Sequence, residues 1–153
     1  MVNLTGMMSR ILAAFSAPRP APLPEPDNKL ALGALLVRVA KSDRVYRVEE
    51  IARIDHVLAR LYALNPVEAA RMRATCEKLE RAAPETDRFA MLIRDTVDRE
   101  VRIAALGALW EVALADGADD PAETAVIDAA RHAMGLTEAE TAAARSLAAG
   151  GAQ

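Results

Sequence analysis

The sequence is poor in the residues that build aromatic cores, disulfides and irregular loops. Aromatic residues make up 3% of the chain, there are 7 glycines in 153 residues, and most of the 8 prolines fall between Pro18 and Pro26. Cys76 is the only cysteine, which excludes an internal disulfide and a zinc cluster built on cysteines. Because helix breakers are few and 52% of residues are hydrophobic, we predict an all-α fold packed through alanine and aliphatic side chains.

Long hydrophobic runs and concentrated positive charge are also missing. The apolar run Ile11–Phe15 is shorter than the core of a secretory signal, and no run approaches the roughly 18 residues of a membrane span. We therefore expect a cytoplasmic protein without a transmembrane segment. The net charge of −3 does not suit a nucleic-acid-binding protein, which needs a basic face.

The sequence contains no recognisable catalytic motif. It has no glycine-rich phosphate loop, no HExxH pair and no grouping of a nucleophile with a base. His56 and His132 stand apart from other candidate ligands, and Trp110 is most simply a core residue in a helix. We expect a protein that is not an enzyme.

Four segments follow from composition. Residues 1–16 form a short amphipathic helix or stay disordered, with apolar residues at helical spacing, namely Leu4, Met7, Met8, Ile11, Leu12 and Phe15. Residues 17–27 are a proline-rich linker that favours an extended, semi-rigid spacer. The helical domain covers 28–149, and 150–153 form a frayed tail. The first segment is open to three readings: disorder or packing back, contact with a membrane surface, or binding a partner.

The domain is predicted to be a compact bundle of about seven helices. Apolar spacing and turn signals place them near 29–41, 48–62, 66–81, 85–96, 98–115, 121–133 and 138–149. Three sequences read as N-caps followed three residues later by Glu, beginning at Asn65, Asp120 and Thr137. The ranges 29–41 and 98–115 carry long, nearly uncharged stretches, so we expect these two helices at the centre of the bundle.

One pattern occurs twice in the chain. Val39 to Asp43 is followed by Glu50, and 73 positions later (112 − 39 = 73) Val112 to Asp116 is followed by Glu123. In each copy an apolar helix runs into a loop that opens with Asp, and Glu begins the next helix seven residues on. The sequence therefore predicts two related helical halves. Arg38 and Glu111 also share a repeat position, and we expect them to pair near an axis between the halves.

The repeated carboxylates are the candidate metal site. Hard cations such as calcium or magnesium are bound by several oxygen ligands. Because the acidic loop after Asp116 is too short to wrap an ion alone, ligands from both halves are needed. We expect the ligands to be Asp43, Glu50, Asp116 and Glu123, with Asp119 and Asp120 at the rim.

Helix chemistry alone offers a competing explanation. Asp120 is suited to capping a helix, Glu123 to the positive end of its dipole, and Gly117 to a helix C-cap. In the first half, Arg44 and Arg47 would neutralise a carboxylate pocket or bind an anion. No cofactor is required under this interpretation.

These residues resemble the TerB-like family of tellurite-resistance-associated bacterial proteins, whose domain type also occurs at the N-terminal side of the co-chaperone DjlA. The resemblance rests on Ala34–Asp43, Glu50–Ile54 and Leu109–Gly117 with Glu123, and covers about residues 28–147. It implies an all-helical domain with two related halves and an acidic cluster for a divalent cation. Arg44 departs from the glycine of the family pattern.

The resemblance also implies a role in metal or envelope stress. On this basis we expect a helical binding module that serves an unidentified protein partner, such as membrane-associated stress machinery, and that binds no nucleic acid. The alternative is a metal-independent interaction, scaffold or co-chaperone-like module, in which the carboxylates only cap helices and the N-terminal segment makes the contact.

Overall fold

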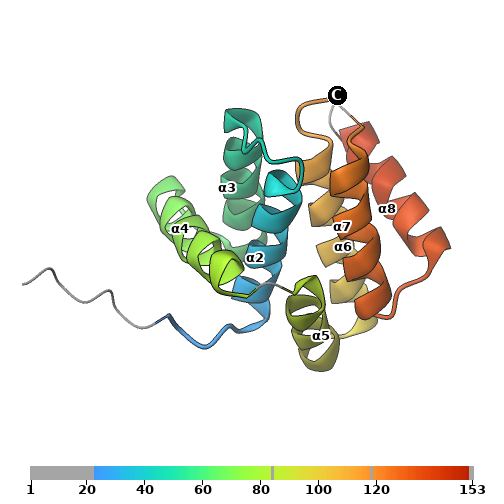
Figure 1. The fold of residues 1–153 in the computed structure, drawn as a ribbon, viewed down its shortest axis with the longest axis horizontal. Coiled ribbons are helices and arrows are strands. Elements are labelled where there is room, and N and C mark those ends of the chain that lie inside the picture. The colour runs from blue at the N-terminus through green and yellow to red at the C-terminus, as the bar shows by residue number, and fades with distance from the viewer. Residues whose placement is uncertain (1–22, 84, 118, 152–153) are drawn as a thin grey trace, which may run out of the picture.

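The computed structural model describes residues 23–83, 85–117 and 119–151, and this part of the chain is helical without strands. Figure 1 shows the helices, whose labels are kept here. Their bounds are α2 Asn28–Lys41, α3 Val48–Tyr62, α4 Pro66–Ala82, α5 Thr86–Thr96, α6 Arg99–Ala113, α7 Pro121–Ala133 and α8 Glu138–Gly151. The predicted all-α class and the seven helices of the domain are confirmed.

Side-chain caps fix where most of these helices begin. Asp27 accepts a hydrogen bond from the backbone N–H of Leu30 at 2.8 Å, which starts α2. Asn65 and Glu68 form the predicted reciprocal capping box at the start of α4. Thr137 and Glu140 make the same pair of bonds, at 3.1 and 2.8 Å, before α8. Local sequence therefore sets these boundaries independently of the core.

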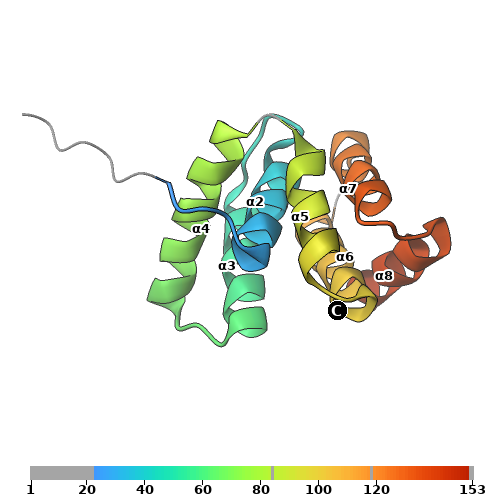
Figure 2. The same cartoon turned by 90° about the horizontal axis from the view of Figure 1, so that it is seen from below.

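The two apolar helices occupy the centre, as predicted. α2 lies against α3, α4, α5, α6 and α7, and α6 lies against α2, α3, α5, α7 and α8. Figures 1 and 2 show α3 and α4 on one side of α2. On the opposite side of the bundle lie α6, α7 and α8. α2 contacts α7 just as α6 contacts α3, which is the reciprocal packing expected of two related halves.

The predicted pair between Arg38 and Glu111 is wrong. The Arg38 guanidinium donates to the carbonyl oxygens of Glu80, at 2.9 Å, and of Ala83, and its Nε lies 3.6 Å from the Glu80 carboxylate. Glu111 instead accepts two hydrogen bonds from Arg60, at 3.0 and 2.7 Å. Arg38 thus satisfies carbonyls at the end of α4, where a helix lacks internal donors and where positive charge is favourable.

Several predictions lie at the edges of the described residues. The segment 1–16, most of the linker 17–27, and the last two residues lie outside them. α8 continues to Gly151, slightly past the predicted end of the domain. Among the described helices, none combines the length and the hydropathy needed to cross a membrane.

One close approach between α2 and α4 depends on a glycine. A Cβ placed on Gly33 would lie 2.2 Å from the Cys76 Sγ and 3.3 Å from its Cβ. Both residues are buried, so neither can move into solvent. The two helices therefore pack closely only because one residue lacks a side chain and the other has a small one.

Replacing Gly33 by Ala is expected to destabilise the protein by about 1–3 kcal/mol through overpacking. The loss should largely disappear in a Cys76→Ala background, where the clashing sulfur is absent. Gly107→Ala is the matched control, because it is also inside a helix but has no atom within 4 Å of the added Cβ. The free energy of unfolding of Gly107→Ala should rise by up to about 1 kcal/mol, because alanine has a higher helix propensity than glycine. Chemical denaturation of the four variants measures these differences, and a Gly33→Ala variant as stable as the wild type would contradict the packing argument.

Candidate metal centre

Two buried glutamates meet where the halves of the bundle join. Glu50 lies in the first turn of α3 and Glu123 in the first turn of α7, and each side chain is only 1% exposed. Each lies seven residues after the aspartate of the loop that follows a central helix, Asp43 or Asp116, and the reciprocal packing of α2–α3 with α6–α7 brings the two glutamates together. These are the fully buried charged residues of the described chain.

The environment of the two carboxyl groups favours their protonated forms when no cation is present. Burial raises the pKa of Glu50 to about 7, and the negative charges of Asp43 and Asp116 add to the effect. Burial also raises the pKa of Glu123 to about 8, together with the charge of Glu50. Within the described structure, both oxygens of Glu50 and one oxygen of Glu123 accept no hydrogen bond. Such oxygens are costly to bury unless something supplies positive charge or a proton.

Asp43 joins the glutamates. One carboxylate oxygen each from Asp43, Glu50 and Glu123 can be chosen so that all three lie within 4.8 Å of one another. Asp43 follows α2, and its Oδ1 accepts the backbone N–H of Val45 at 2.9 Å, which holds the loop in a tight turn. The structure therefore brings together three of the four predicted ligands.

Asp116, the fourth predicted ligand, lies beside this group and is bridged to it by Arg47. The Arg47 Nη1 donates to Asp116 at 3.2 Å, and other nitrogens of the same guanidinium lie 4.0 Å from Asp43 and from Glu50. The Arg47 side chain is 43% exposed, far more than the carboxylates that it contacts. Arg44 and Arg47 were expected either to neutralise the pocket or to bind an anion, and Arg47 is the one whose guanidinium contacts the carboxylates, whereas Arg44 is exposed.

The two predicted rim residues take other contacts. Asp119 forms an ion pair with Arg145 of α8 at 2.9 Å, and Arg145 stacks over Trp110 at 4.8 Å from the ring centre. Asp120 caps α7 by accepting the N–H of Ala122 at 2.8 Å. The predicted return bond from Glu123 to this cap is wrong: the side chain of Glu123 is buried against Glu50.

The loops of the two halves share one unusual backbone conformation. Arg44 has φ +69° and Gly117 has φ +74°, and the two positions are equivalent in the repeat (117 − 44 = 73). Glycine adopts this left-handed conformation freely, whereas an L-residue is strained there. The first half therefore keeps the loop shape of the second half even though its sequence is less suited to it.

The arrangement fits a hard divalent cation. Calcium is bound by carboxylate oxygens at about 2.3–2.6 Å, so ligands on opposite sides of one ion lie up to roughly 5 Å apart. The three carboxylate oxygens all lie within 4.8 Å of one another, which is inside this limit. Magnesium, with ligands at about 2.0–2.1 Å, is bound by the same kind of oxygen at shorter distances. The donor type and the closeness of the oxygens therefore suit calcium or magnesium.

The remaining sequence candidates are structural. Cys76 is fully buried and burial raises its pKa to about 12, which makes it a poor nucleophile or metal ligand. Trp110 is a core residue whose Nε1 donates to Thr141 at 2.9 Å. His56 and His132 are exposed. Sequence reasoning did not anticipate that Glu50 and Glu123 would be so deeply buried, because each looked like an ordinary first-turn glutamate.

Comparison with known proteins supports the sequence resemblance. A family model described as tellurite resistance protein TerB matches residues 29–146, most of the chain. The chain belongs to the TerB family. The matched range includes the whole carboxylate cluster of this TerB-family protein, and TerB is not a known family of enzymes. No curated protein and no solved structure matched the chain.

The buried pair predicts an unusual dependence of stability on pH. Both glutamates have a higher pKa folded than unfolded, so the folded chain holds protons that the unfolded chain releases above pH about 4.5. The stability that the two protonated glutamates contribute to the fold is fully present below that pH and is lost as the pH rises through 7 to 8. The side chains of a Glu50→Gln, Glu123→Gln variant stay neutral at every pH. The free energy of unfolding of this variant, relative to that of the wild type, should therefore rise by on the order of 3 kcal/mol between pH 5 and 8. Denaturation in a chelating buffer tests this, and a constant difference across that range would contradict it.

Relieving the strained loop should stabilise the protein. Arg44→Gly is expected to raise the free energy of unfolding by about 0.5–1 kcal/mol, because the relieved strain exceeds the entropy cost of glycine. Gly117→Ala should lower it by about 1 kcal/mol, and no atom lies within 4 Å of the added Cβ, so the loss would report backbone strain alone. Thermal and chemical denaturation of both variants provide the measurement, and a loss in Arg44→Gly would show that its side chain has an unrecognised role.

Proposed function

We propose that this TerB-family protein is a non-enzymatic helical module that binds one divalent cation, calcium or magnesium, between its two halves. The direct ligands would be Asp43, Glu50 and Glu123, and Asp116 would complete the negative charge around the ion. The observation that carries the proposal is the burial of two opposed carboxyl groups, three of whose four oxygens have no hydrogen-bond partner within the described residues. A cation with oxygen preference would supply the missing positive charge.

Arg47 bears on the strength of binding. With all four carboxylates ionised and Arg47 charged, the cluster carries −3 (1 − 4 = −3), a field that attracts a divalent cation. The guanidinium contacts Asp43, Glu50 and Asp116, so it competes with an ion for the same oxygens. Because its side chain is 43% exposed, it can turn into solvent at modest cost. Binding should therefore be weak to moderate and easily reversed.

The cellular role that we propose is in metal or envelope stress, through a protein partner such as membrane-associated stress machinery. Support comes from the family description, tellurite resistance protein. Direct reduction of tellurite is not part of the proposal, because the single thiol, Cys76, is buried and its pKa is raised to about 12. The proposed contribution is ion binding that adjusts a surface for a partner.

Arg47 also favours a second candidate function. Since its guanidinium already bridges three carboxylates, the bundle has a built-in counterion and can fold without a metal. The protein would then be a metal-independent interaction module, in which the cluster serves only to join the two halves.

Titration calorimetry with calcium and magnesium separates these functions. We expect heat of binding for wild type with at least one of the two ions, and loss of that binding in an Asp116→Asn, Glu123→Gln variant. Glu49→Gln is the control, because Glu49 neighbours Glu50 on α3 but is exposed and outside the cluster. It should bind as wild type does. Absence of heat with wild type would end the metal proposal, and equal heats in all three proteins would place the ion elsewhere.

Removing the competing arginine should strengthen binding. Arg47→Gln is expected to lower the calcium dissociation constant by about tenfold, which is about 1.4 kcal/mol, because one positive charge leaves the cluster. Arg44→Gln removes the same charge from a neighbouring exposed position that forms no ion pair within the described residues. It should change affinity much less. If Arg47→Gln weakened binding, the arginine would be supporting the site rather than competing for it.

A further inference from the structure

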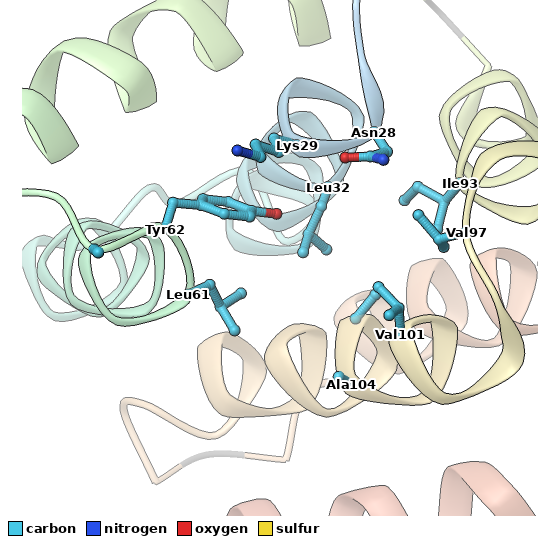
Figure 3. A pocket seen from close by; sticks show the side chains of 11 residues that line it. Asn28, Lys29, Leu32, Leu61, Tyr62, Ile93, Val97, Val101 and Ala104 are labelled. Atoms are coloured by element: carbon cyan, nitrogen blue, oxygen red, sulfur yellow. The ribbon is translucent and has the colours of Figure 1, made fainter.

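We propose that two copies of this protein exchange their N-terminal segments, residues 3–16 of each copy entering an apolar pocket of the other. The pocket lies at the beginning of α2, far along the bundle from the loops that carry the acidic cluster (Figures 1 and 3). It is formed by residues outside the proposed metal centre, so the inference is independent of metal binding.

The pocket has the size and the lining of a binding site for apolar side chains. It has a volume of about 560 Å³ and is lined by residues of α2, α3, α5 and α6, with Val97 and Ala63 at helix ends. Figure 3 shows side chains converging on it from these elements, among them Leu32, Leu61, Tyr62, Ile93, Val97 and Val101. Volumes of roughly 300–1,000 Å³ are typical of sites that bury a ligand.

Two of these side chains are exposed although they are large and apolar. Val101 is 50% exposed and Leu61 is 38% exposed, and they reach the pocket from α6 and α3. Covering them would remove apolar surface from water, which is the general driving force for association. An apolar segment that fills the pocket would therefore gain from both its own burial and theirs.

The chain itself carries a segment of suitable chemistry. Residues 3–16 place apolar side chains at helical spacing, and no acidic residue occurs before Glu25, whereas Arg10 is basic. The surroundings of the pocket include the carboxylates of Asp27 and Asp98, which cap the helices that begin beside it, and one lysine, Lys29. The apolar side chains of the segment thus match the apolar lining of the pocket, and its basic residue matches the carboxylates nearby, as in helix-in-groove recognition.

The spacer favours a second copy over the chain's own pocket. Every residue from 17 to 26 is either a proline, whose φ is fixed, or directly precedes one and is disfavoured from helical conformations, so the sequence favours an extended spacer. At about 3.1 Å per residue, an extended spacer of ten residues would hold the segment roughly 30 Å from the start of α2. A 14-residue helix returning along the spacer spans only about 21 Å, so it ends short of the pocket beside which the spacer begins.

Reciprocal exchange solves this geometry. Two chains placed side by side can each present the segment to the other's pocket, and the twofold symmetry closes the assembly at a dimer. Both segments are buried at once, so neither pocket nor segment is left to recruit a third chain.

The test is the mass of the full chain in solution, measured by light scattering across a concentration series in a chelating buffer. Wild type is expected to dimerise. Val101→Glu should raise the dimer dissociation constant at least tenfold, because it places a charge in the pocket. The variant should still fold, because Glu is favourable at the third position of a helix that Asp98 caps. Val67→Glu makes the same change at the start of α4, outside the pocket, and should leave dimerisation unchanged. Far-ultraviolet circular dichroism checks that both variants are folded.

Variants of the segment and the spacer test the occupant. Leu12→Glu should weaken the dimer as Val101→Glu does, and Ser9→Glu, on the other face of the segment, should weaken it much less. Replacing the spacer prolines by Gly and Ser should yield a compact monomer, because a flexible spacer lets the segment reach its own pocket. A wild-type chain that stays monomeric at millimolar concentration, or a dimer insensitive to both Val101→Glu and Leu12→Glu, would overturn the proposal. So would a wild-type monomer whose pocket takes up a small amphiphile instead.

Discussion

The structure depends on the opposition of two buried glutamates. Glu50 and Glu123 stand at the starts of equivalent helices, and the packing that joins the halves puts them face to face. Two negative charges at this depth would oppose the packing, so the halves can close only if a proton, the Arg47 guanidinium or a bound cation compensates. The loops that follow α2 and α6 serve this requirement, since they supply both the additional carboxylates and the arginine.

The two halves answer this requirement differently, although they are built on one pattern. Arg44 adopts the backbone conformation that Gly117 adopts freely, which shows that loop shape is retained where sequence has changed. Arg47 is equivalent to Asp120 (120 − 47 = 73), and one supplies positive charge to the cluster while the other caps a helix. The two halves are therefore similar in backbone and complementary in charge.

Local chemistry made the fold predictable, whereas contacts between helices were less so. Caps such as Asn65 and Thr137 set helix starts from a few neighbouring residues, and uncharged stretches identified α2 and α6 as central. The repeat also indicated which carboxylates are equivalent. It could not show which residues touch: Arg38 and Glu111 are equivalent but have separate partners, because side-chain direction is set by packing. The burial of Glu50 and the pocket at the beginning of α2 could not be predicted either, because both form only when helices distant in sequence pack together.

The position of the cluster on the join between the halves has a consequence for stoichiometry. Tandem calcium-binding loops that each wrap an ion hold two ions, which can then bind cooperatively. Here Asp43 and Glu50 of the first half and Glu123 of the second contribute to the same space. An ion held there would be shared, one for each chain, and its binding isotherm would be hyperbolic. The duplicated unit would thus give a single site whose occupancy reports directly on whether the halves are joined.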